Sequence, residues 1–330
     1  MRNLDLPYRQ KGVVVLLILL VVIVSSTGLF LASANSSTRS VTEQQEIIFQ
    51  MEQAKAALIA HATNYDDFQN DGDGNSVITD EGPGRFPCPD TDNDGLPNTG
   101  CTAYQHGRLP ESITLTNGNT YRFGATYAGI DRQFWYVVSP AFSQNTTSAL
   151  NTSNTGALTL DGESGIVAVI IAPGAALASQ DRSTGTNTAS NYLEGSNASG
   201  SSFINSYAAD PGNFNDLVLP ITTNEVRTAM AYKVAQRVKY WLDYVYNVYF
   251  NEYLGSWYSG YYYNFNWLVT VLSDQNSDDL RFWAGSQDNW NGNYTYTKVS
   301  TNVARMTFTN CGITFTLTYG GGITKSQPAC

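Results

Sequence analysis

The chain has 330 residues, enough for two domains or one large one, and a formal net charge of −10 at pH 7. Only 14% of its residues are charged, against about 25% in an average soluble domain. This composition argues against nucleic-acid binding, because phosphate neutralisation needs clustered Lys and Arg. The two histidines, His61 and His106, leave little scope for His-based catalysis or zinc chemistry. A hydrophobic content of 42% argues against intrinsic disorder.

The N-terminus combines a basic leader with a long apolar run. Residues 1–12 carry two arginines and a lysine, and residues 13–32 contain no charge. A helix of that length spans about 30 Å, the thickness of a bilayer core, and the basic leader should stay cytoplasmic. Residues 33–64 continue as an amphipathic helix, because their apolar residues recur every three or four positions: Val41, Ile47, Ile48, Met51, Ala54, Leu58 and Ala62.

A short basic leader ending in glycine, an apolar half and an amphipathic half together resemble a type IV prepilin or a type II secretion pseudopilin. The resemblance implies that prepilin peptidase cuts after Gly12 and methylates Val13. It further implies an inner-membrane subunit whose partners are other pilin or pseudopilin subunits, with its head in the periplasm or in an extracellular filament. Major subunits of this family carry Glu where this chain has Leu17, which favours a minor component at a filament tip. The alternatives are a plain signal anchor and a cleaved secretory signal, with Ala32-Ser33-Ala34 as its cleavage site.

The sequence of the exported part predicts an α+β fold, in which the long N-terminal helix packs on an antiparallel β-sheet head. We assign residues 65–222 to the head, with an Asp-rich loop, and residues 223–330 to a second long helix and a further antiparallel sheet. Strands are expected at 120–127, 133–138, 157–160, 165–172, 294–299, 303–309 and 313–319. Residues 179–202 are expected to form a polar surface loop.

The second helix is expected from Thr223 or Asn224, as its N-cap, to about residue 254, with Glu225 in its first turn. Its core-facing stripe consists of Val226, Met230, Val234, Val238, Trp241, Val245 and Tyr249.

Four cysteines, Cys88, Cys101, Cys311 and Cys330, indicate disulfides in an exported chain. Four cysteines allow three pairings, and proximity along the chain favours Cys88–Cys101 and Cys311–Cys330. A zinc site is disfavoured, because the chain has no C-x-x-C pair.

Asp90, Asp92 and Asp94, followed by Gly95, match the first half of a calcium-binding loop. The closing Glu of a complete EF-hand loop is absent, since Cys101 occupies its position. A second cluster of Asp71, Asp73 and Asn75 lies upstream. Calcium is therefore a candidate ligand, and simple turn formation by Asp, Asn and Gly is the alternative.

Between residues 240 and 267, 14 of 28 residues are aromatic. Trp257, Tyr261, Tyr262 and Tyr263 either pack between the second helix and the sheet or form a partner-binding surface, for example for a surface glycan. Common catalytic motifs are missing, so no enzymatic activity is expected, although a carboxylate-based exported hydrolase remains a weaker alternative. We interpret the chain as a minor pilin-like subunit, with a single-pass membrane-anchored adhesin or carbohydrate-binding protein as the alternative.

Overall fold

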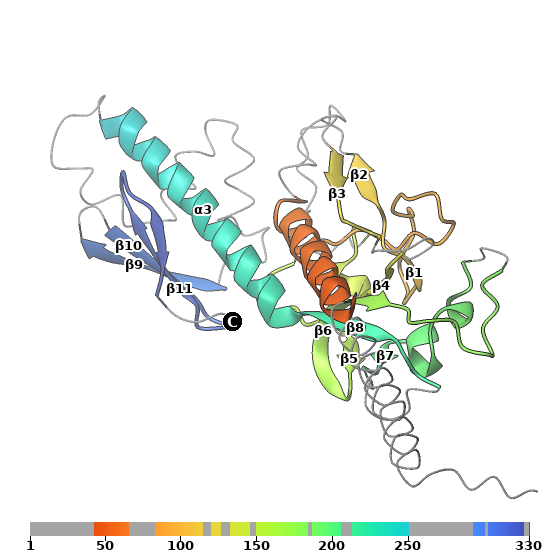
Figure 1. Ribbon diagram of the computed structural model, residues 1–330. Coiled ribbons are helices and arrows are strands. Elements are labelled where there is room, and N and C mark those ends of the chain that lie inside the picture. The colour runs from red at the N-terminus through yellow and green to blue at the C-terminus, as the bar shows by residue number, and fades with distance from the viewer. Residues whose placement is uncertain are drawn as a thin grey trace, which may run out of the picture. The chain divides into compact units, whose positions relative to one another are not determined.

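The computed structural model describes residues 43–65, 83–114, 120–126, 133–145, 150–183, 187–205, 213–250, 293–300, 303–326 and 330 (Figure 1). The chain divides into two compact units, Met1–Gln50 and Met51–Cys330. The described residues form a mixed α+β fold with two helices and several antiparallel sheets, as the sequence predicts at that level. The predicted membrane segment at 13–32 lies outside the described residues.

The first described helix covers residues 43–63. Its predicted stripe is buried from Met51 onward, where Met51, Ala54, Leu58 and Ala62 are at most 2% exposed. Burying a Leu or Met side chain contributes about 2 kcal/mol, so this stripe fixes the helix from residue 51 onward within the second unit. The prediction fails at Ile48, whose side chain is 44% exposed.

A six-stranded sheet forms the centre of the head. Its strands are β1 (Gly107–Arg108), β4 (Trp135–Val138), β6 (Glu163–Ala172), β5 (Leu158–Leu160), β7 (Ser202–Phe203) and β8 (Leu217–Thr222). Hydrogen-bonded neighbours follow the path β1-β4-β6-β5-β7, and β8 pairs with β6 outside this path. Only β5 and β7 run parallel to one another. β6 is paired along both edges, and all residues of Ile166–Ala172 are buried. Because successive side chains point to opposite faces, burial on both faces explains this unbroken apolar sequence. A separate hairpin joins β2 (Ser112–Thr114) to β3 (Thr120–Arg122).

Residues 187–201, which lead into β7, cover one face of this sheet and contain the short helices η2 (Ala189–Asn191) and η3 (Gly195–Ala198). Tyr192, Leu193 and Phe203 pack there against Trp135, Val169 and other sheet residues in one buried cluster. The expected surface loop at 179–202 is therefore wrong for this part, which contributes to the core. A third short helix, η1 (Pro140–Phe142), follows β4.

The second long helix, α3, covers Thr223–Phe250. Its N-cap is Thr222, so neither of the two predicted caps, Thr223 and Asn224, is the cap. The Thr222 backbone N–H donates to Glu225 Oε2 at 2.8 Å, and the Glu225 N–H donates to Thr222 Oγ1 at 3.3 Å, which is a capping box. Thr223 instead uses its hydroxyl to bond Gly165 O at 2.6 Å. The predicted stripe is confirmed at Val226, Met230, Val234 and Val238, which are all buried.

A four-stranded antiparallel sheet follows, in the order β12-β11-β10-β9. It consists of β9 (Tyr294–Ser300), β10 (Val303–Phe308), β11 (Thr314–Thr318) and β12 (Ile323–Lys325). Alternate residues such as Ala304, Met306 and Phe308 are buried, and β11 packs beside α3 (Figure 1). This alternation is the period-2 pattern that predicts the strands.

Candidate functional site

The acidic sequence Asp90–Gly95 lies in a loop that the head holds at both ends. Phe86 donates its backbone N–H to Phe142 O at 2.7 Å, and Asp90 exchanges backbone hydrogen bonds with Arg108 in β1. The disulfide Cys88–Cys101 joins the two ends of the loop. The structure also contains a second disulfide, Cys311–Cys330. Both are the pairings that sequence proximity favours.

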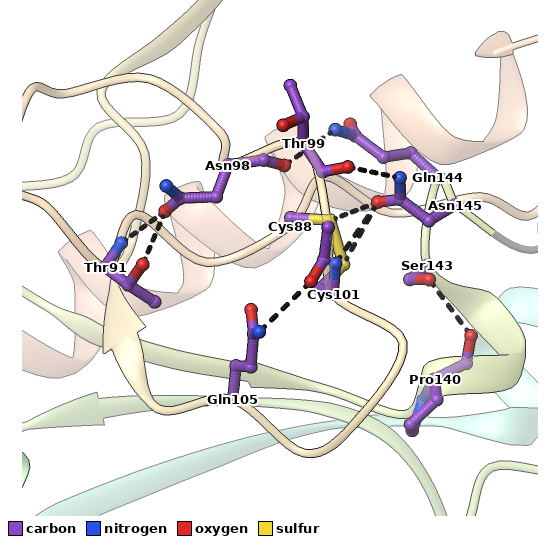
Figure 2. Close-up of a disulfide and its surroundings, with 11 residues drawn as sticks. Cys88, Thr91, Asn98, Thr99, Cys101, Gln105, Pro140, Ser143, Gln144 and Asn145 are labelled. Carbon is purple, nitrogen blue, oxygen red and sulfur yellow. Dashed lines mark hydrogen bonds between the residues drawn. A yellow bond between two sulfur atoms is a disulfide. The ribbon is translucent and has the colours of Figure 1, made fainter.

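Asn145 supports the disulfide from a distant part of the chain, as Figure 2 shows. Its Oδ1 lies 2.7 Å from Cys88 Sγ and accepts the Cys101 backbone N–H at 3.4 Å. Its Nδ2 donates to Thr99 O at 2.7 Å. On the other side of the loop, Thr91 donates its hydroxyl to Asn98 Oδ1 at 3.0 Å. The loop is thus held by side chains on both sides of the acidic segment.

Asp90 is the buried member of the acidic group, with a side chain only 2% exposed. Its Oδ1 accepts the Asn93 N–H at 2.6 Å, and its Oδ2 accepts the Gly95 N–H at 2.8 Å. The turn between them needs left-handed backbone at Asn93 (φ 65°) and at Gly95 (φ 82°), which Asn and Gly tolerate better than other residues. Asp90, Asn93 and Gly95 therefore form a turn, as the alternative to calcium binding predicts.

Asp92 and Asp94 are exposed, and one oxygen of each lies within 4.8 Å of the others and of an Asp90 oxygen. Burial raises the pKa of Asp90 above its ordinary value, the N–H groups of Gly95 and Asn93 oppose this, and the negative charge of Asp94 adds to the rise. A cation between the three carboxylates would remove this repulsion. Hard oxygen ligands at this spacing suit Ca²⁺ better than a soft metal.

Glu111 is a nearby carboxylate that sequence reasoning did not find. A Cβ placed on Gly95 would lie 3.6 Å from Glu111 Oε2, and the Glu111 N–H donates to Gly95 O at 2.9 Å. The local spacing of a calcium loop contains no signal for Glu111, because the chain returns to Gly95 only after passing through the disulfide and β1.

Comparison with known proteins finds no matching family, no similar curated protein and no similar solved structure. No described helix is both long enough and apolar enough to cross a bilayer. The sequence-predicted residues outside the described ranges are Gly12, Val13, Leu17, Asp71, Asp73, Asn75, Trp257, Tyr261, Tyr262 and Tyr263.

The two histidines are both withdrawn from solvent. His61 is fully buried, with its ring edge-to-face against Tyr65, Tyr121 and Phe123 at centroid distances of 5.8, 6.0 and 5.5 Å. His106 is half-buried beside Phe203. Burial lowers the pKa of each to about 4, so both rings are neutral near pH 7.

Proposed function

We propose that the chain is a minor pilin-like or pseudopilin-like subunit, processed after Gly12 and held in the inner membrane by residues 13–32. Its head would lie in the periplasm or in an extracellular filament, and its work would be assembly into or at the tip of that filament, without catalysis. One observation carries the proposal. The leader and apolar run lead along the chain into a helix whose apolar stripe is buried in an α+β head.

Polar contacts hold the helix from residue 51 onward to the head, in addition to its apolar stripe. Lys55 Nζ lies 2.6 Å from Glu225 Oε1 in the first turn of α3 and donates to Pro220 O of β8 at 2.8 Å. The Gly84 N–H donates to Ala62 O at 2.7 Å near the helix end. A helix fixed in this way suits a subunit whose head is carried by its N-terminal segment.

The tip position rests on Leu17. In the family that this N-terminus resembles, a Glu at this point is thought to pair with the N-terminal amine of a neighbouring subunit. An unpaired charge in an apolar bundle is costly, so a subunit with Leu there fits a position where that pair is not made.

The mature N-terminus of the full-length protein tests the proposal. Mass spectrometry should find a chain that begins at methylated Val13. The Gly12→Leu variant should keep its leader, whereas Ala34→Leu, which would block a secretory signal site, should not change the product. A mature chain that begins at Asn35, or one that keeps Met1, would contradict a pilin-like subunit and favour a secreted or plainly anchored protein.

Within the same proposal, the loop of Asp90, Asp92 and Asp94 binds one structural Ca²⁺. The chelating residues would be these three carboxylates, and Glu111, whose side chain lies beside Gly95, would be a further candidate. Support comes from their mutual distance and from the negative charge of Asp94, which adds to the rise that burial causes in the pKa of Asp90. The upstream cluster of Asp71, Asp73 and Asn75 stays a prediction.

Thermal unfolding with calcium and with a chelator tests this site. At a calcium concentration a hundredfold above the Kd, the expected stabilisation is about 2.7 kcal/mol. The double variant Asp92→Asn, Asp94→Asn should lose the calcium-dependent shift in Tm, and Glu163→Gln, which changes an exposed acid elsewhere, should keep it. Equal Tm values for the wild type in calcium and in chelator would reject the site, leaving the loop as a turn.

A further inference from the structure

Glu194 and Asp216 form a pair of buried carboxyl groups apart from the acidic loop. Glu194 is 6% exposed and Asp216 is fully buried. Glu194 directly precedes η3 in the segment that covers the sheet, and Asp216 directly precedes β8 of the sheet itself. The pair therefore lies where the covering segment meets the sheet.

The two residues bind one another through reciprocal hydrogen bonds, in which the backbone N–H of each donates to the side-chain carboxylate of the other. The Glu194 N–H donates to Asp216 Oδ2 at 3.0 Å, and the Asp216 N–H donates to Glu194 Oε2 at 3.1 Å. Asn197 Nδ2 donates to Asp216 Oδ2 at 3.1 Å, and Gln180 Nε2 donates to Glu194 Oε1 at 2.7 Å. Asp216 Oδ1 is buried and accepts no hydrogen bond in the described part of the chain. It is thus the oxygen left to carry a proton.

The charged groups nearby do not neutralise the pair. Arg182 reaches it only through Gln180: its guanidinium donates to Gln180 Oε1 at 2.6 Å and to the carbonyls of Gly174, Asn191 and Tyr192. The Cζ atom of Arg108 lies 4.1 Å from the centroid of the Tyr192 ring and 4.4 Å from that of the Trp135 ring, so this guanidinium stacks on aromatic rings. Asp181 accepts its hydrogen bonds from Ser183. Among the described residues, no ion pair includes Glu194 or Asp216.

We propose that Glu194 and Asp216 share one proton, and that this proton holds residues 187–201 closed on the sheet until a rise in pH removes it. Two ionised carboxylates in contact in a buried site repel one another, whereas a carboxylic acid donates a hydrogen bond to its neighbour. Opening of the segment would expose Tyr192, Leu193 and the ring of Trp135, which are buried together. The pair is thus a pH-sensitive clasp, independent of the proposed filament role.

The direction of the effect follows from the protons bound in each state. Burial raises the pKa of Asp216 to about 8, and the charge of Glu194 adds to that rise, whereas the ordinary value is 3.8. Between these values the closed state holds a proton that the open state releases. The opening equilibrium constant should therefore increase with pH, by up to tenfold per pH unit, and level off above about pH 8.

The window from pH 6.5 to 8 isolates this pair. Below pH 6.5 the two buried histidines act in the opposite direction, because their pKa values are lowered. Within the window, the wild type should show an increase in the opening constant of about fifteenfold, because the pair is already half deprotonated at pH 8.

Hydrogen exchange of the full-length protein, corrected for intrinsic exchange rates, measures this constant for residues 187–201. Asp216→Asn should remove the pH dependence, because the amide donates the same hydrogen bond without titrating. Glu194→Gln should move the levelling-off to lower pH, because it removes the charge that adds to the rise in the pKa of Asp216 while burial still raises that pKa. The exposed Glu163→Gln should keep the wild-type profile. A flat wild-type profile would overturn the proposal, as would the wild-type profile in both Asp216→Asn and Glu194→Gln. If Asp216→Asn does not fold, the wild type and Glu194→Gln decide the outcome.

Discussion

Replacing Cys88 and Cys101 together by alanine is expected to lower the free energy of unfolding by about 4 kcal/mol. The disulfide closes a loop with a sequence separation of 13, and the loss of that constraint on the unfolded chain accounts for about 3 kcal/mol. Both cysteines are fully buried, so the small cavity left by the two sulfurs adds about 1 kcal/mol. Urea denaturation followed by tryptophan fluorescence measures the change.

The double variant Cys311→Ala, Cys330→Ala is the matched control. Its disulfide has a sequence separation of 19 and so a similar loop term, but its cysteines are partly exposed. The control should therefore cost about 1 kcal/mol less. If the Cys88, Cys101 variant costs no more than the control, burial of that disulfide adds nothing to stability.

Acidification from pH 6.5 to pH 4 is expected to remove about 3 kcal/mol of stability through His61 alone. The folded protein keeps this ring neutral down to a pKa of about 4, whereas the unfolded chain takes up a proton near pH 6.5. The unfolded state therefore binds more protons between these values, and stability falls as the pH falls. Equilibrium denaturation at a series of pH values measures the slope.

His61→Phe keeps an aromatic ring against Tyr65, Tyr121 and Phe123 and removes the titrating group. It should lose less stability than the wild type between pH 6.5 and pH 4. His106→Gln, at the other histidine, should leave the His61 contribution in place. Equal acid losses in His61→Phe and in the wild type would show that His61 does not set the acid limit of the fold. Asp216 titrates in the opposite direction in the same window, and comparing variants cancels its contribution.

The candidate calcium site was predictable from sequence only where it is local. Asp90, Asp92 and Asp94 are alternate residues of one turn, so their spacing alone indicates that their carboxylates converge. Glu111 comes to Gly95 through the path of the chain around the disulfide and β1, which no spacing rule contains. The burial of Asp90 likewise depends on its bridge to Arg108.

The polar stretch at residues 179–202 was predicted wrongly for a different reason. Residues 179–202 are rich in Ser, Thr, Asn and Gly, a composition typical of surface loops, yet Glu194 and Asn197 are buried there. Their hydrogen-bond partners Asp216 and Ile204 lie further along the chain. A polar residue is buried only when such partners satisfy it, and composition cannot identify them.

The sequence by itself determined the repeating elements. The three-to-four-residue period of Val226, Met230, Val234 and Val238 and the alternation through Met306 are properties of neighbouring residues, and so the helix and strands follow from them. Closely spaced cysteines indicated their partners for the same reason. Only the tertiary structure decided which polar groups are buried, at His61, Glu194 and Asp216. Burial depends on what distant segments pack against a side chain, and this packing sets the protonation of these groups.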